Sequence, residues 1–281
     1  MPRGNLEGFE PRPLIFLKAR ELLDKSELLP CLLLLRRQKV DLNYLIDYNP
    51  VLFLQCVVPL VREILTLNPD LLSLLVSSLE PGDTTASKYP TPAPVDTVSE
   101  FIIWRASQLP VKDFYEGSKK VNIVCSAVRE ALLKYLNHSQ GDRVNAALYP
   151  ALCTYAKQNP PMLVEALTLI KTVTFSSDKG GQGQLFPASR APAAIKYLAL
   201  LAEGSALFDA ALGCCDFDMA RAVARQCQMD PKAYLPLLKV CLNINAAYCH
   251  TLILCLLDEQ QLLFQQAFLT TFFCNLLSAN T

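Results

Sequence analysis

Charged residues are scarce in this 281-residue sequence, and neither sign is in excess. Only 19% of the residues are charged, and 26 Lys and Arg residues balance 26 Asp and Glu residues. The sequence therefore lacks the positive field that draws a protein to nucleic acid or to an anionic membrane. A neutral chain is better suited to a protein partner than to a phosphate backbone. Hydrophobic residues make up 52%, which at this length is enough for a sizeable buried core.

Groups for metal binding and catalysis are also scarce. The two histidines, His138 and His250, have no set of Cys, Asp or Glu at ligand spacing, and a metal or catalytic site needs several converging side chains. The glycines of Lys179–Gly183 lack both the G-K-[ST] continuation and the preceding strand of a phosphate-binding loop. We therefore expect no enzyme activity, no metal and no cofactor.

Paired cysteine motifs are missing although the sequence has eleven cysteines. None has C-x-x-C spacing, and Cys214-Cys215 are adjacent. The first residues also contain no apolar segment typical of a signal peptide. We expect a reducing compartment and free, mostly buried thiols.

Uninterrupted apolar runs long enough for a membrane span are absent as well. Val51–Leu67 is broken by Pro59, Arg62 and Glu63, and Thr251–Leu277 contains acidic residues near its middle. A spanning helix needs about 20 continuous apolar residues, so neither run is predicted to cross a membrane.

Strand signals do not occur, and apolar residues instead recur at helical spacing. The predicted apolar faces are Ile15, Ala19, Leu22 and Leu23; Leu28, Leu29, Leu32, Leu33 and Leu35; and, in a central helix Val121–Leu136, Val121, Val124, Cys125, Val128, Leu132 and Leu136. Four dipeptides mark predicted helix starts: Asn49-Pro50, Asn68-Pro69, Asn159-Pro160 and Asp230-Pro231. Asn or Asp accepts hydrogen bonds from the first free backbone N–H groups, and Pro at the first helical position loses none. Thr97 with Glu100 fits a capping box.

The predicted fold is all-α, an α-solenoid of stacked antiparallel helix pairs. Its repeats are degenerate and TPR-like, because no strict 34-residue period is present. The Pro-, Thr- and Ser-rich segment Glu80–Pro94 and the Gly-rich segment Ser176–Pro192 are predicted loops. The expected domains are a first helical block (1–80), a Pro-rich linker with a candidate insertion (81–118), a central helical block (119–175), a flexible loop (176–192), a TPR-like block (193–239) and a hydrophobic tail (240–281).

Local charge clusters have two interpretations each. Arg36–Lys39 and Lys119-Lys120 could contact RNA or an acidic partner, or lie at a solvated helix end, where cations favour the carbonyl terminus; we favour the helix end. A further group consists of Asp216, Asp218, Arg221 and Arg225. Spacings of three and four put these charges on one helical face, as an interaction surface between repeats or as a local ion pair with acids at a helix N-terminus. The sequence leaves both open.

Several motifs, in order along the chain, resemble one family. They are Met1–Glu7 (MPRGNLE), Arg37–Asn43 with Asp47–Pro50 (RQKVDLN and DYNP), Lys120–Leu132 (KVNIVCSAVREAL), Ala194–Leu201 (AIKYLALL) and Leu212–Leu238, which contains DFD and DPKAYLPLL. In this order they resemble the large scaffold subunit of the Elongator complex, also called the IKAP family.

The resemblance also indicates where this chain departs from the family. MPRGNLE joins two β-propellers to the helical half in the family, so we expect the chain to be a fragment of that half. Ser99–Ser118 has no family counterpart and is expected to be an insertion. The likeness stops at Lys239, and we hypothesise that Val240–Thr281 is translated intron or an alternative exon. The family's basic tRNA-contact region and its dimerisation part follow that point.

The resemblance implies a non-catalytic scaffold that supports modification of wobble uridine in tRNA. The chemistry would belong to a radical-SAM acetyltransferase-like subunit, tRNA would be contacted only indirectly through the complex, and no membrane is implied. The implied localisation is the cytoplasm, with the nucleus as a second compartment. An alternative is an α-solenoid adaptor of a vesicle coat or tethering complex, which shares the helical periodicity but does not explain MPRGNLE or the order of the motifs.

Overall fold

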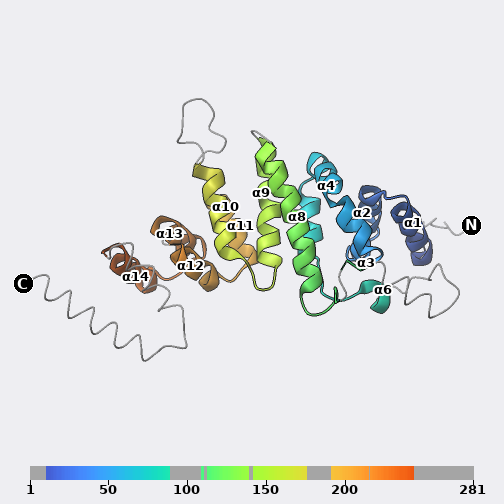
Figure 1. Ribbon diagram of the computed structural model, residues 1–281. Coiled ribbons are helices and arrows are strands. Elements are labelled where there is room, and N and C mark those ends of the chain that lie inside the picture. Colours follow the sequence, from blue (N-terminus) through green and yellow to red (C-terminus); the bar gives the residue numbers. More distant parts are fainter. Residues whose placement is uncertain are drawn as a thin grey trace, which may run out of the picture. The chain divides into compact units, whose positions relative to one another are not determined.

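The computed structural model describes residues 11–88, 109–110, 113–138, 142–175, 191–214 and 216–243 (Figure 1). Throughout these residues the regular secondary structure is helical, and none of them lies in a strand. The all-α prediction is confirmed. The chain separates into two compact units, Met1–Pro161 and Met162–Thr281. They are called unit 1 and unit 2 and are described separately.

Unit 1 is built from helices that pack on their neighbours in sequence. Its elements are α1 (Arg12–Asp24), α2 (Leu28–Arg37), α3 (Tyr44–Asp47), α4 (Pro50–Leu67), α5 (Asp70–Ser77), α6 (Thr84–Ser87), α8 (Lys119–His138) and α9 (Asp142–Lys157). Helix α1 packs on α2, and α2 packs on α4. The pair α8 and α9 lies side by side in Figure 1, and α8 packs on α4 while α9 packs on α5. The helices from both ends of unit 1 therefore share one core.

Unit 2 continues the same pattern of stacked helices. Its elements are α10 (Leu163–Phe175), α11 (Ala191–Leu201), α12 (Gly204–Gly213), α13 (Phe217–Gln226) and α14 (Pro231–Asn243). Helix α10 packs on α11 and α12, α13 packs on α11 and α12, and α14 packs on α13. The division between the units lies within the range 119–175 that the sequence groups as one block, because α9 packs within unit 1 and α10 within unit 2.

The predicted helix starts have three different outcomes. Helix α4 begins at Pro50, and the Asn49 side chain accepts a hydrogen bond from the backbone N–H of Leu52 at 3.0 Å. Helix α14 begins at Pro231 after Asp230, so both of these predictions are confirmed. Helix α5 begins one residue later than predicted, at Asp70, whose N–H donates to the side chain of Asn68.

The prediction that Asn159-Pro160 starts a helix is wrong. The peptide bond between them is cis, and α10 begins only at Leu163. Asn159 instead contacts α8: its N–H donates to Oδ1 of Asn122 at 3.0 Å, and its side chain donates to Oγ of Ser118 at 3.0 Å. The side chain is therefore not available to cap a following helix.

The predicted apolar faces form most of the core. In α1, Ile15, Ala19 and Leu23 are buried, and in α8 the buried positions include Val121, Val124, Cys125, Val128 and Leu132. In α2, Leu28, Leu32 and Leu35 are buried, but Leu33 is 37% exposed.

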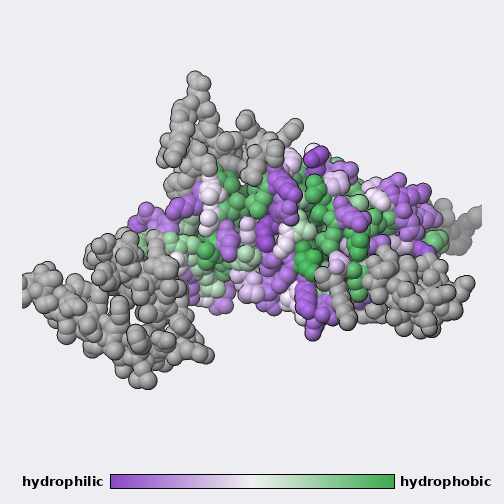
Figure 2. All heavy atoms as spheres, in the orientation of Figure 1, coloured by the Kyte–Doolittle hydropathy of each residue, from purple (hydrophilic) through white to green (hydrophobic). Residues whose placement is uncertain are grey.

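The visible surface carries hydrophobic residues among hydrophilic ones (Figure 2). The exposed large apolar side chains of the chain include Leu14, Leu17, Val58, Leu67, Leu74 and Leu200.

Helix α4 is long and apolar enough, by length and composition alone, to cross a membrane. In unit 1 it is a core helix, because Phe53, Val57, Leu60, Val61 and Ile64 are each buried among protein side chains. Pro59, Arg62 and Glu63 lie on its exposed face. That Val51–Leu67 does not cross a membrane stays a prediction.

The predicted loop Glu80–Pro94 differs from the structure over its described part. Residues 80–88 contain the short helix α6, and Thr84 is buried at 2% exposure. The turn forms because Oδ1 of Asp83 accepts hydrogen bonds from the N–H of Thr85 at 2.9 Å and from its hydroxyl. Polar side chains at short spacing, taken as a loop signal in the sequence, here attach the segment to unit 1.

The cysteine prediction is met in part by the described residues. Cys31, Cys125 and Cys153 are buried as expected, whereas Cys56, Cys214 and Cys227 are partly exposed. The reducing compartment stays a prediction. Several other predictions lie outside the described residues: the Thr97–Glu100 capping box, the Gly180–Gly183 glycines, the side chains of His138 and His250, residues 99–108 and 111–112 of the candidate insertion, and residues 244–281 of the hydrophobic tail.

Candidate functional site

The candidate interaction surface predicted from the sequence lies on α13 in unit 2. Helix α13 starts after Asp216, whose side chain accepts a hydrogen bond from the backbone N–H of Met219 at 3.0 Å. The opposite face of α13 is anchored by buried Met219 and Val223. This arrangement places the charged positions of α13 away from the core of unit 2.

Asp216 differs from the other three predicted residues in its contacts, because it pairs with a neighbouring helix and caps α13. Its Oδ2 lies 2.6 Å from Nζ of Lys171 on α10, and its side chain is only 19% exposed. Partial burial raises the pKa of Asp216, but the hydrogen bonds from Lys171 and the N–H of Met219, with the Lys171 charge, outweigh it and lower the pKa below its ordinary value of 3.8. Asp216 therefore caps α13 and ties it to α10.

Asp218, Arg221 and Arg225 form the exposed part of the predicted surface. Oδ1 of Asp218 lies 3.7 Å from a guanidinium nitrogen of Arg221, one helical turn away, and the Asp218 side chain is 95% exposed. Arg225 is exposed in the last turn of α13. A solvent-exposed pair of this type contributes about 0.3–0.5 kcal/mol to stability. The ion pair therefore contributes little to the fold, and an interaction role for these side chains stays a prediction.

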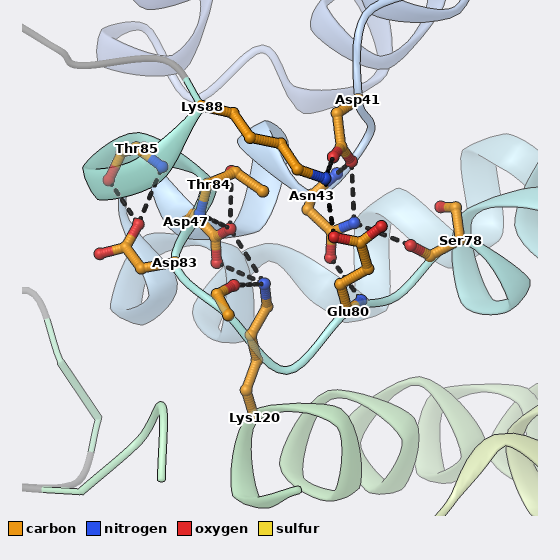
Figure 3. Close-up of polar contacts among 11 residues, drawn as sticks. Asp41, Asn43, Asp47, Ser78, Glu80, Asp83, Thr84, Thr85, Lys88 and Lys120 are labelled. Carbon is orange, nitrogen blue, oxygen red and sulfur yellow. Dashed lines mark hydrogen bonds and ion pairs between the residues drawn. The ribbon is translucent and has the colours of Figure 1, made fainter. Parts of the chain in front are cut away.

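Among the described residues, the charges with the least exposed surface are Asp47 and Lys120 in unit 1, and the sequence did not indicate their burial (Figure 3). Nζ of Lys120, in the first turn of α8, lies 2.7 Å from Oδ1 of Asp47 at the end of α3, and both side chains have no exposed surface. Lys120 also donates to Oδ2 of Asp47 at 2.9 Å and to the carbonyl oxygen of Gly82 at 2.8 Å. Its ammonium group lies 5.7 Å from the ring centre of Tyr115.

Thr84 donates two further hydrogen bonds to the Asp47 carboxylate. Its backbone N–H donates to Oδ2 at 3.0 Å and its hydroxyl donates to the same oxygen at 2.7 Å. Burial raises the pKa of Asp47 and lowers the pKa of Lys120, against the mutual attraction of the two charges and the hydrogen bonds. The two charges remain stable in the interior because each is paired and hydrogen-bonded.

A second group of polar contacts lies beside this pair (Figure 3). The side-chain amide of buried Asn43 donates to the carbonyl oxygen of Ser78 at 2.7 Å, and its Oδ1 accepts from the N–H of Glu80 at 3.0 Å. Nζ of Lys88 donates to Oδ2 of Asp41 at 2.9 Å and to Glu80 at 2.7 Å. These contacts connect α3, the end of α5 and the segment that contains α6.

The two basic clusters have opposite outcomes. Arg36 and Arg37 lie exposed in the last turn of α2, as the helix-end interpretation predicts. The interpretation is wrong for Lys119-Lys120, which opens α8, because Lys120 is fully buried against Asp47 while Lys119 forms exposed ion pairs with Asp113 and Glu116. In the part of the chain that the structure describes, no three His, Cys, Asp or Glu side chains form a group that could hold a metal ion.

Comparison with known proteins settles the family. The model of the ELP1 alpha-solenoid matches residues 12–241. The chain belongs to this family. Elongator complex protein 1 of Oryctolagus cuniculus is 31% identical over 250 residues, which cover 88% of this chain and 17% of that protein. Putative elongator complex protein 1 of Xenopus laevis is 31% identical over 250 residues, covering 88% of this chain and 19% of that protein. Elongator complex protein 1 of Saccharomyces cerevisiae is 28% identical over 250 residues, which cover 84% of this chain and 17% of that protein.

The chain thus spans less than a fifth of the length of these relatives. The ELP1 alpha-solenoid match starts at the first residue of α1 and ends within α14. The resemblance read from the sequence stops at Lys239, and the family match ends two residues later, at residue 241. Both charged groups described above, on α13 and around Lys120, lie inside the matched residues.

Proposed function

We propose that this chain is part of a non-catalytic scaffold subunit of the Elongator complex that supports modification of wobble uridine in tRNA. The observation that carries the proposal is the ELP1 alpha-solenoid match over residues 12–241, together with relatives named Elongator complex protein 1. Other subunits, including the radical-SAM acetyltransferase-like one, supply the chemistry. The tRNA is reached only through them, in the cytoplasm and in a nuclear fraction.

The geometry of the charged groups supports a scaffold role. A catalytic acid or base must come within hydrogen-bond reach of a substrate. Asp47 and Lys120 are fully enclosed and bonded to one another, and Asp216 is engaged by Lys171 and by the N-terminus of α13. Stacked helices whose exposed faces carry charged side chains, as α13 does, are suited to binding other proteins.

The test of the proposal is the modification state of tRNA. The transcript that encodes the chain is depleted in its native cells, and modified wobble uridine is quantified by mass spectrometry of tRNA nucleosides. We expect its level to fall and to recover on re-expression, while unrelated tRNA modifications stay constant. An unchanged level after complete depletion would contradict the proposal.

A second experiment tests the α13 surface. Asp218→Arg combined with Arg221→Glu and Arg225→Glu changes exposed charges without touching the contacts of Asp216. We expect recovery of partner subunits with the tagged protein to fall about tenfold or more, as for loss of a binding hot spot. Lys18→Glu, which alters an exposed ion pair on α1, is the matched control. Equal recovery with both variants would show that α13 does not bind a partner.

A further inference from the structure

The segment Glu80–Lys88, called the strap, is attached to unit 1 in an unusual way. Its sequence, EPGDTTASK, contains no large apolar residue. Pro81 and Gly82 are exposed, and Thr84 is buried with its polar groups bound to Asp47. Hydrophobic burial, the main force that holds the helices together, therefore contributes little to holding the strap.

Polar contacts at both ends and in the middle of the strap hold it in place of hydrophobic burial (Figure 3). At the start, the N–H of Glu80 donates to Asn43; at the end, Nζ of Lys88 bridges Asp41 and Glu80. These end contacts are solvent-exposed or part-buried, and ion pairs in contact with solvent stabilise a structure only slightly. The central contacts are different, because both hydrogen bonds of Thr84 are buried and Lys120, which donates to Gly82, has no exposed surface.

The central contacts all involve the Asp47–Lys120 pair. Oδ2 of Asp47 accepts both hydrogen bonds of Thr84, and Lys120 donates to the carbonyl oxygen of Gly82. The same two side chains join α3 to α8. One residue of α8 thus contacts the strap and α3 at once, and the attachment of the strap depends on a helix that follows it in the chain.

We propose that the strap is a polar latch, held closed by the Asp47–Lys120 pair, that opens as a unit while the surrounding helices of unit 1 stay folded. Elements with few buried apolar contacts open locally at a lower free energy than the core. The helices α4, α5, α8 and α9 keep their own apolar core when the strap opens, since the described side chains of the strap contribute no buried apolar residue to it. This inference is independent of the proposed function.

The latch also determines where the chain leaves the helices. Lys88 is the last described residue before residue 109, and its ammonium group is fixed on Asp41 and Glu80. Closing the strap therefore holds this exit point against α3. Opening it releases the exit point without unfolding α8.

The experiment is amide hydrogen exchange of the full chain, resolved by mass spectrometry, in three variants. The double variant Asp47→Leu/Lys120→Met removes the charges that hold the strap but retains apolar bulk in the interior. We expect strap amides such as that of Thr84 to exchange about tenfold faster or more, as for loss of a hydrogen bond to a charged group. Amides in α4 and α9 should keep their wild-type exchange rates.

Two further variants complete the test. Lys119→Met, beside Lys120 but exposed in surface ion pairs, should leave exchange of the strap unchanged. Thr84→Val, which removes one hydroxyl bond to Asp47, should accelerate exchange only within the strap. Wild-type exchange of the strap in the double variant would overturn the proposal. So would accelerated exchange spread equally over α4, α8 and α9, because the pair would then stabilise the whole unit and not a latch.

Discussion

Nζ of Lys120 lies 2.7 Å from Oδ1 of Asp47 inside unit 1, and neither side chain reaches solvent. The two residues are 73 positions apart in the chain. Removing one member of a buried pair leaves an uncompensated charge in the interior, whereas removing both does not. The pair therefore joins α3 to α8, and by this argument it is not the main source of the stability of unit 1.

This asymmetry gives the first prediction. Lys120→Met should lower the free energy of unfolding by about 3–5 kcal/mol, because it leaves the Asp47 carboxylate buried and unpaired. The double variant Asp47→Leu/Lys120→Met should be much closer to the wild type in stability. Urea unfolding followed by circular dichroism measures both. A loss of stability in the double variant equal to the sum of the two single-variant losses would contradict the account. Lys119→Met changes an exposed lysine and serves as the control.

The second prediction concerns Asp216, which caps α13 and pairs with Lys171. Asp216→Asn keeps a side-chain oxygen for the cap but removes the charge, so we expect a loss of less than about 1 kcal/mol. Asp216→Ala removes both contacts and should cost about 1 kcal/mol more, the usual value of a helix cap. Thermal unfolding of the two variants distinguishes the cap from the ion pair. Equal losses would mean that the cap contributes nothing.

The pH dependence of that contact follows from the direction of the pKa shift. The pKa of Asp216 is lowered in the folded protein from 3.8, so the carboxylate stabilises the fold above that pH and the contribution is lost as the pH falls through the lowered value. In wild type, unit 2 should lose stability below about pH 4. Asp216→Asn should show a shallower decline over the same range.

The third prediction compares two glycines of unit 1, Gly82 in the strap and Gly117 before α8. Gly117 has φ of +55°, a conformation that side chains with a Cβ adopt at a cost, whereas Gly82 has no such angle, and neither has an atom within 4 Å of an added Cβ. Gly117→Ala should therefore destabilise unit 1 by about 1 kcal/mol through the backbone alone. Gly82→Ala should change stability by less than about 0.5 kcal/mol. A larger loss for Gly82→Ala in urea unfolding would refute the comparison.

The fourth prediction concerns thiol reactivity. Burial raises the pKa of Cys31 and of Cys125 to about 12, and the thiolate is the reactive form. In the folded protein at about pH 8, below the ordinary thiol pKa, Cys31 and Cys125 should resist alkylation, while partly exposed Cys56 should react faster than either. Mass spectrometry after a short iodoacetamide pulse measures the order, and alkylation in urea gives the unprotected reference. Equal rates for Cys31 and Cys56 in the folded protein would be incompatible with this packing.

Local signals in the sequence predicted much of the fold. The starts of α4 and α14 follow from Asn49-Pro50 and Asp230-Pro231, because capping depends on residues that are adjacent in the chain. The same dipeptide at Asn159 predicted a helix start wrongly, since Asn122 and Ser118 bind its polar groups instead. Capping signals are therefore reliable only where no tertiary partner competes for the side chain.

The buried polar cluster could not be predicted from local pattern. Lys119 and Lys120 are adjacent and chemically identical, yet one is exposed and the other has no exposed surface. Only the position of Asp47 on α3 distinguishes them, and that depends on how α3 and α8 pack. On α13, by contrast, the spacing of Asp218 and Arg221 predicted their ion pair directly. Whether that face binds a partner remains a prediction of the proposed function.

The measurement that most directly tests the central claim is affinity purification of the tagged full chain from extracts of its native cells, with mass spectrometry of the proteins that accompany it. Far-ultraviolet circular dichroism of the purified chain first establishes that it is folded and helical. The account predicts recovery of the acetyltransferase-like subunit together with other Elongator subunits. Recovery of vesicle-coat or tethering proteins in their place, or of no Elongator subunit by a folded chain, would contradict it.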